Sequence, residues 1–288
     1  MLIFRLNIDL FLIFTYMRKL ILSLLFLLLI FFLLYEPFNK NKQLIDFELN
    51  HVFFAHRGVP YLAENSDASF SESLRIGFTA LETDIQITKD QKLIVFHDDN
   101  VKRLLGLDLN IEDCNWKDIK DLNILNNGLE SNNSVLLFDD LLQNYSDFNL
   151  IYLDIKAKPR KYIADKLLLK LEQNKRLSTF LIADSNILFL AYLKFKNPNI
   201  KTVLEGYSSG KEWVYYLIPV KYRPNFLASL YNDIDIRHIS FLKEHDLIKK
   251  KIVYGIKYNQ IPIAIKEGLH HFITDYNAEI DSLIFSVK

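Results

Sequence analysis

Two acidic residues, Glu82 and Asp84, lie two positions apart in the apolar run ALETDIQI at 80–87. Side chains two apart in a strand point to the same face, so the two carboxylates share one face. Burying both in ionised form is costly unless a countercharge lies between them. A hard divalent cation with oxygen ligands supplies that countercharge. The pair therefore predicts a metal site, and Asp154, at the end of another apolar run, would supply its third carboxylate.

Histidines and basic residues end other apolar runs. His56 and Arg57 follow VFFA, His97 follows LIVF, and Lys156 lies two positions beyond Asp154 and on the same face. An ion and two basic side chains can neutralise a phosphate and the charge that develops on it. One histidine can take a proton from a nucleophile while the other gives one to the leaving oxygen. Together these residues predict metal-assisted cleavage of a phosphodiester.

These side chains can meet only if the strands that carry them are neighbours. Short β-branched or aromatic runs alternate with amphipathic helical patterns from residue 45 onward, which is typical of βα units. We expect eight strands, at 51–56, 80–87, 150–155, 180–184, 201–206, 226–231, 251–256 and 270–274. An extra strand at 92–99 should return beside the second, and the asparagine-rich stretch 123–134 should be a surface excursion. The prediction is an α/β fold, a (β/α)₈ TIM barrel over 45–288 whose site lies at the carboxyl ends of the strands.

The first 38 residues are strongly apolar. The run LILSLLFLLLIFFLLY at 20–35 contains a single serine and approaches the ~20 residues that span a bilayer. A signal peptide is the alternative interpretation, although no small-x-small cleavage pattern follows the run. Arg18 and Lys19 precede it, which places the N-terminus in the cytoplasm. We predict a transmembrane anchor at 1–38, a barrel outside the cytoplasm, and Met17 as an alternative start.

Charge and cysteine content exclude several classes of protein. The chain has 35 Lys plus Arg and 35 Asp plus Glu, so it lacks the basic excess of a nucleic-acid-binding protein. Its one cysteine, Cys114, excludes an intramolecular disulfide framework and a multi-cysteine zinc site. The expected partners are a small-molecule substrate and a membrane, and the oligomeric state is not predicted.

The order of motifs HRG, EN, E-x-D, HD and acid-x-Lys resembles the glycerophosphodiester phosphodiesterase family over residues 52–278. The resemblance implies a phospholipase C-like TIM barrel that hydrolyses a glycerophosphodiester to glycerol 3-phosphate and an alcohol with Ca²⁺ or Mg²⁺. It also implies a role for each matching residue: acid and base for His56 and His97, metal ligands for Glu82 and Asp84 with Asp154 at the third position, phosphate contacts for Arg57 and Lys156, and places in the first loop of the site for Glu64 and Asn65.

Two segments depart from the family pattern. Asp154 stands where the family usually has Glu, so its carboxylate is one methylene shorter. The sequence GIKYN at 255–259 stands where the family often has Trp-Thr-Val-Asn. We therefore expect a displaced or weaker metal site and the loss of the aromatic wall beside the glycerol.

Other functions stay open on the sequence alone. A lysophospholipase D-type enzyme, or a hydrolase of an envelope glycerophosphate polymer, would keep the chemistry and change the substrate. A non-catalytic barrel would bind a phosphate headgroup without cleaving it, provided that Asp154 no longer supports metal binding. An inositol-lipid phospholipase C shares the barrel and the histidine pair, but it explains the three carboxylates less well. Asp275 is either a helix cap or a site residue.

Overall fold

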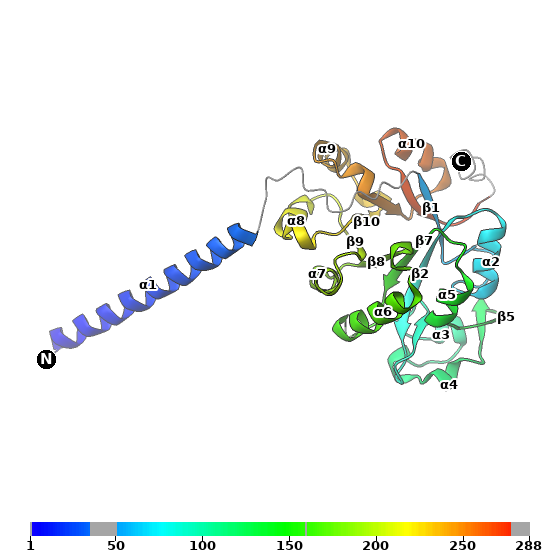
Figure 1. Cartoon of the computed structure of the whole chain (residues 1–288), viewed down its shortest axis with the longest axis horizontal. Helices are drawn as coiled ribbons and strands as arrows, with labels where there is room; N and C mark the ends of the chain where they lie inside the picture. The colour runs from blue at the N-terminus through cyan, green and yellow to red at the C-terminus, as the bar shows by residue number, and fades with distance from the viewer. Residues whose placement is uncertain (1, 35–50, 159, 278–288) are drawn as a thin grey trace. The chain divides into compact units, whose positions relative to one another are not determined.

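The computed structural model describes residues 2–34, 51–158 and 160–277 (Figure 1). The chain divides into two compact units, one with the N-terminal helix and Trp213–Arg223, the other with the strands. The N-terminal helix is α1 (Leu2–Leu34), and its window Phe14–Phe31 has a mean hydropathy of 1.9 with none of it buried. That length and composition suit a membrane span, and a signal sequence has the same properties. The predicted junction between anchor and barrel lies outside the described residues.

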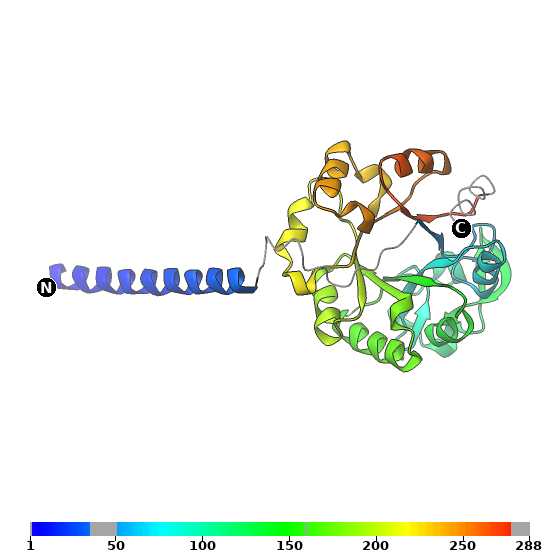
Figure 2. The ribbon, with the colours of Figure 1, turned by 45° about the horizontal axis from the view of Figure 1, so that its top comes forward.

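Eight parallel strands form a closed barrel. They are β1 (Val52–His56), β2 (Ala80–Ile87), β7 (Leu150–Ile155), β8 (Phe180–Asp184), β9 (Lys201–Leu204), β10 (Phe226–Leu230), β11 (Lys251–Tyr254) and β12 (His271–Thr274). Each strand pairs in parallel with the next, and β1 closes the ring by pairing with both β2 and β12. Within the unit that contains them, the strands are surrounded by helices (Figure 2). Every strand lies within its predicted range, and the predicted TIM barrel is confirmed.

Short antiparallel strands extend the sheet beyond β2. β3 (Leu93–Val95) pairs with β2, as the sequence predicts, and β6 (Leu136–Leu137) pairs with β3. The stretch expected as a surface excursion contains a hairpin of β4 (Asn123–Asn126) and β5 (Leu129–Ser134). Its turn residues Asn127 and Gly128 have φ of 52° and 80°, the left-handed conformation that an Asn-Gly hairpin turn requires.

The connections between strands are short helices and turns. The α-helices are α2 (Asp67–Arg75), α3 (Lys102–Leu105), α4 (Trp116–Ile119), α5 (Phe138–Asn144), α6 (Arg160–Asn174), α7 (Ile187–Lys196), α8 (Glu212–Leu217), α9 (Ile236–Glu244) and α10 (Ile261–Lys266). The 3₁₀ turns are η1 (Ile111–Asp113), η2 (Leu177–Thr179), η3 (Val220–Tyr222), η4 (Tyr231–Asp233), η5 (Ile248–Lys250) and η6 (Tyr258–Gln260). Polar caps begin several of these helices; Asn186, for example, accepts hydrogen bonds from the first backbone N–H groups of α7.

The barrel interior is apolar, and its side chains determine which residues reach the mouth. Each barrel strand contributes to this core: Phe54, Ala80, Tyr152, Ala183, Val203, Ala228, Ile252 and Ile273 are among its members. Side chains alternate along a strand, so the residue two positions after one of these core residues also faces the barrel interior, nearer the carboxyl end of the strand. The side chains that this alternation places in the mouth include His56, Glu82, Asp154, Glu205, Leu230, Tyr254 and Asp275.

Candidate active site

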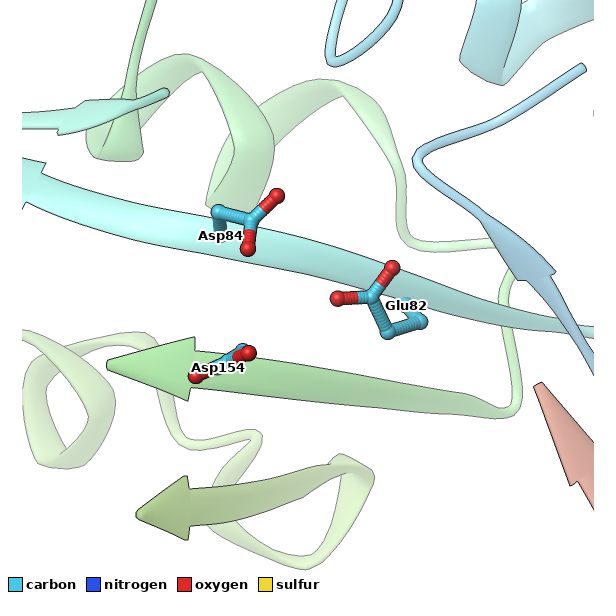
Figure 3. A group of neighbouring side chains, drawn as sticks. All are labelled: Glu82, Asp84 and Asp154. Carbon is cyan, nitrogen blue, oxygen red and sulfur yellow. The ribbon is translucent and has the colours of Figure 1, made fainter. Parts of the chain in front are cut away.

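Three carboxylates meet where β2 and β7 lie side by side (Figure 3). One oxygen each from Glu82, Asp84 and Asp154 lies within 4.8 Å of the other two, and Asp84 and Asp154 are register partners. Asp84 is fully buried, and its Oδ1 accepts no hydrogen bond from the described residues. A buried oxygen of this kind is available to a cation. The three side chains therefore fit a divalent ion, and the shorter Asp154 still lies within the group.

Electrostatic repulsion within this group is strong. Burial and the charge of Asp84 raise the pKa of Glu82 to about 8. Burial and the same neighbouring charge also raise the pKa of Asp154. Both shifts mean that ionising these carboxylates destabilises the folded protein unless additional positive charge is present.

Arg57 lies against the carboxylates and turns the chain at the end of β1. Its Nε is 3.0 Å from Oδ2 of Asp84, and its backbone N–H donates to Oε2 of Glu82 at 3.1 Å. Arg57 has φ of 52°, and Gly58 follows with φ of 96°. A Cβ on Gly58 would lie 2.0 Å from Oγ of Ser69, so only glycine fits there. The HRG motif thus directs the guanidinium towards Asp84.

Lys156 supplies the second cation. Its Nζ donates to Oδ2 of Asp154 at 2.5 Å and lies 3.6 Å from Oδ1 of Asp84. Burial disfavours this ammonium, but the charges of Asp154 and Asp84 outweigh burial and raise the pKa of Lys156. Lys156 is therefore charged and shares the predicted metal site.

The first loop holds these groups in position. Asn65 donates from Nδ2 to Oδ2 of Asp84 at 3.0 Å and accepts from the Thr83 hydroxyl at 2.7 Å. Glu64 accepts two hydrogen bonds from Arg103, at 2.7 and 2.8 Å, and one from Arg57 at 3.2 Å. Both predicted loop residues thus lie at the site. In the described structure they contact protein groups, and their contact with a substrate stays a prediction.

Both predicted histidines have a carboxylate partner on the same ring nitrogen. Nδ1 of His56 is 2.8 Å from Oδ1 of Asp275, and Nδ1 of His97 is 2.6 Å from Oδ1 of Asp98. A carboxylate there favours a proton on Nδ1, which leaves Nε2 to exchange a proton with a substrate. Burial opposes the charged form of His56, but the Asp275 hydrogen bond and the charge of Glu82 outweigh it and raise the pKa of His56.

A cleft of about 650 Å³ connects His97 with Lys156. Its remaining lining residues come from the loop after β3 and from the start of α3: Asp98, Asp99, Asn100, Lys102 and Arg103. Arg103 donates to both oxygens of Asp98 and both of Glu64. Arg103 thus forms an ion pair with each of these two acids, and it links the loop that carries His97 to the loop that follows His56.

The model of the glycerophosphoryl diester phosphodiesterase family matches residues 56–219, more than half of the chain. The chain belongs to this family. All nine predicted site residues lie within the match, so the family assignment and the geometry concern the same part of the barrel.

Known members of the family resemble this chain at modest sequence identity. Human lysophospholipase D GDPD1 is 34% identical over 78 residues, which cover 27% of this chain and 24% of that protein. An Oleispira antarctica phosphodiesterase, solved with the product sn-glycerol 3-phosphate, has a TM-score of 0.68 at 19% identity, covering 82% of this chain and 97% of that one. Glycerophosphodiester phosphodiesterase from Thermotoga maritima has a TM-score of 0.64 at 24% identity, covering 83% and 100%. The structural matches show the shared fold.

The sequence analysis missed Glu205 and left Asp275 undecided. Glu205 follows β9 and accepts a hydrogen bond from the Tyr152 hydroxyl at 2.7 Å. Burial and the charge of Asp154 raise the pKa of Glu205 to about 7. Asp275 follows β12 and contacts His56. Both residues stand two positions beyond an inward-facing apolar side chain, and that alternation is the signal that could have identified them.

The aromatic wall that family members often have beside the glycerol is altered in this chain. The position of the usual Trp is taken by Ile256, which is buried. Tyr254, two residues earlier, points inward from β11, and burial and the charges of Glu205 and Asp154 raise its pKa to about 12. The usual Trp is therefore absent, as the sequence predicts, and the mouth has an aromatic ring from a different position.

Proposed function

We propose that the protein is a divalent-cation-dependent phosphodiesterase that hydrolyses glycerophosphodiesters to glycerol 3-phosphate and an alcohol. One observation carries this proposal: two histidines, each oriented by a carboxylate, lie in the same barrel mouth as three clustered carboxylates and two charged basic groups. Family membership supports the reaction. The product in the Oleispira antarctica structure supports glycerol 3-phosphate as the product here.

Glu82, Asp84 and Asp154 would hold the ion, which when bound supplies Lewis-acid polarisation of the phosphate. Arg57 and Lys156 donate to the phosphate oxygens and counter the charge that develops on them. Arg57 presents several N–H donors in a planar fork, which suits a phosphate group.

The histidines move the protons. The raised pKa of His56 favours its protonated form, which suits donation from Nε2 to the leaving alcohol oxygen. His97 accepts the proton of the attacking hydroxyl, which belongs either to water or to the neighbouring carbon of the glycerol. In the second case the product of the attack is a cyclic phosphate, which water opens to give glycerol 3-phosphate. Asp275 and Asp98 hold the two rings so that Nε2 faces the substrate.

The test is a release assay with the full chain in detergent micelles. We expect glycerol 3-phosphate from glycerophosphodiesters in Ca²⁺ or Mg²⁺ and a complete loss of release in EDTA, because the carboxylate group repels the phosphate when no ion is present. Undiminished release in EDTA would contradict the metal role. No release from any ester would favour the barrel that binds a headgroup without cleaving it.

Lysophospholipids are the second candidate substrate class. The name of the human relative, lysophospholipase D, favours them, and so does an apolar helix that could hold the enzyme at a bilayer. The same assay includes lysophosphatidylcholine. Faster turnover of this lipid than of the water-soluble esters would assign the lysophospholipase D-type activity.

We propose further that α1 is an uncleaved anchor and that the barrel lies outside the cytoplasm. Arg18 and Lys19 precede the most apolar part of the helix, and their long side chains can reach the cytoplasmic interface. We expect the full-length chain to stay in the membrane pellet after alkaline extraction, and protease added to intact cells to digest the barrel. A shortened, soluble chain would instead indicate a cleaved signal peptide. A protected barrel would reverse the orientation.

A further inference from the structure

Exposed large apolar side chains gather at one end of the barrel. Leu188, Ile236 and Ile263 are 80%, 71% and 55% exposed, and Tyr258 is exposed as well. Leu188 follows β8, Ile236 follows β10, and the other two follow β11. Because the barrel strands are parallel, the segments that follow them lie at the same end of the barrel as the catalytic mouth.

The helices that carry these side chains do not use them for packing. α7 buries Phe189 and Leu193, and α9 buries Ile239. Leu188 is the second residue of α7 and Ile236 is the first residue of α9, so neither stands before the helix cap, where an apolar side chain can staple the first turn. Local helix structure therefore does not explain an apolar residue at either position.

Basic side chains accompany the apolar ones. Arg237 follows Ile236, Lys257 precedes Tyr258, and both basic residues are exposed. Apolar side chains interleaved with Lys and Arg are typical of a surface that lies in a lipid–water interface. The apolar groups enter the acyl boundary there, while the long basic side chains stay at the level of the phosphates.

Two observations favour a bilayer over a folded protein as the partner of this surface. The apolar side chains come from separate segments after β8, β10 and β11, and a fluid surface accommodates each of them without a matching pit. The window Phe14–Phe31 of the same chain has the length and composition to cross a membrane. The connection of residues 35–50 spans up to about 55 Å when extended, so the anchor does not fix which end of the barrel faces the bilayer.

We propose that the apolar rim, defined as Leu188, Ile236, Tyr258 and Ile263, inserts into the lipid–water interface, so that the mouth receives lysophospholipids from the bilayer. The catalytic groups need only the headgroup phosphate, and a mouth that faces the interface admits it while the acyl chain stays against apolar side chains. The choice of substrate rests on the phosphodiesterase activity proposed above, whereas insertion of the rim does not.

Insertion is measured without turnover. A polarity-sensitive dye is attached to Ile236→Cys, or to Phe195→Cys near the end of α7, in the full chain reconstituted into phosphatidylcholine vesicles. Phe195 is 67% exposed but lies towards the amino end of the barrel, and the native Cys114 is buried and does not compete for the dye. Lipids with a spin label near the headgroup should quench the dye on Ile236→Cys at least about 3-fold more strongly, because an inserted surface lies at their depth. Equal quenching at the two positions, or stronger quenching at Phe195→Cys, would overturn insertion of the rim.

Turnover tests the choice of substrate. The full chain in vesicles with Ca²⁺ is given lysophosphatidylcholine in the bilayer or glycerophosphocholine in the water. The double variant Leu188→Ser, Ile236→Ser should lower kcat/KM about 10-fold for the lipid, less than full burial of two such side chains contributes, and leave the soluble ester within about 2-fold. The control Phe195→Ser, which removes an equally apolar and exposed side chain, should change neither value.

The outcomes separate the two proposals. Equal losses for both substrates would mean that the variant acts through the fold, and an unchanged rate for the lipid would mean that the rim does not deliver it; either result would overturn the role of the rim in turnover and leave the phosphodiesterase standing. No cleavage of either substrate by the unchanged chain would overturn the phosphodiesterase and with it the lipid substrate. Insertion of the rim would then stand or fall on the quenching alone.

Discussion

The His56→Ala variant is expected to lower kcat on glycerophosphodiesters of choline or ethanolamine by about 10³-fold, within the range that a general acid contributes. These alcohols leave as strongly basic alkoxides unless a proton reaches the oxygen as the bond breaks. His56, with its raised pKa and its Nδ1 bound to Asp275, is positioned to supply that proton from Nε2. The measurement is single-turnover release of the alcohol at saturating Ca²⁺.

The leaving group distinguishes acid catalysis from a loss of structure. A p-nitrophenyl ester of glycerol phosphate releases a weakly basic phenolate that needs no proton, so His56→Ala should slow its cleavage by less than about 10-fold. Asp275→Asn removes the partner that raises the pKa of His56, and the pH at which activity falls on the basic side should move lower. His245→Ala, at an exposed position after α9, is the control. Equal losses for both leaving groups would contradict the role of His56 as the acid.

The predicted site residues that lie together in the structure share a local signal. Glu82 and Asp84 interrupt a strand whose eight residues are all buried, and His56 and His97 end apolar runs. A polar side chain in such a run has a high desolvation cost, so its presence indicates a function that offsets the cost. This reasoning needs only the neighbouring residues, and it selected the three carboxylates that cluster in the structure and both histidines that have carboxylate partners.

The other half of the mouth depends on contacts between distant segments. The pairing of His56 with Asp275 joins residues 219 positions apart, and the hydrogen bond of Tyr152 to Glu205 joins residues 53 apart. Such partners are determined by closure of the barrel, which a single strand does not encode. The aromatic side chain instead follows from alternation along one strand: Tyr254 comes two positions after the inward Ile252, while Ile256 lies beyond the end of β11. Histidines outside the predicted site also have partners from distant segments, since His51 contacts His270 and His238 contacts Glu212.

Replacing Glu82→Gln is expected to stabilise the ion-free protein and to abolish its response to divalent ions. The pKa of Glu82 is raised from 4.5 to about 8, so the folded state favours the protonated carboxyl. The contribution of Glu82 to the free energy of unfolding is therefore fully present below about pH 4.5 and is lost as the pH rises to about 8. A neutral amide removes that loss, which is on the order of a few kcal/mol above pH 8. Gln also keeps an oxygen that can accept the backbone N–H of Arg57.

Thermal unfolding of the full chain in detergent, at pH 5 and pH 9, measures both effects. In EDTA at pH 9 the Glu82→Gln variant should have the higher Tm, and at pH 5 the difference should nearly disappear because Glu82 is then protonated. Added Ca²⁺ should raise the Tm of the unchanged chain through binding to the folded state, and it should raise that of the variant little. The control Glu244→Gln, an exposed carboxylate at the end of α9, should behave like the unchanged chain in every condition. An equal Ca²⁺ response in the variant would place the ion away from Glu82, and a lower Tm in EDTA at pH 9 would mean that Arg57 and Lys156 already compensate the three carboxylates without an ion.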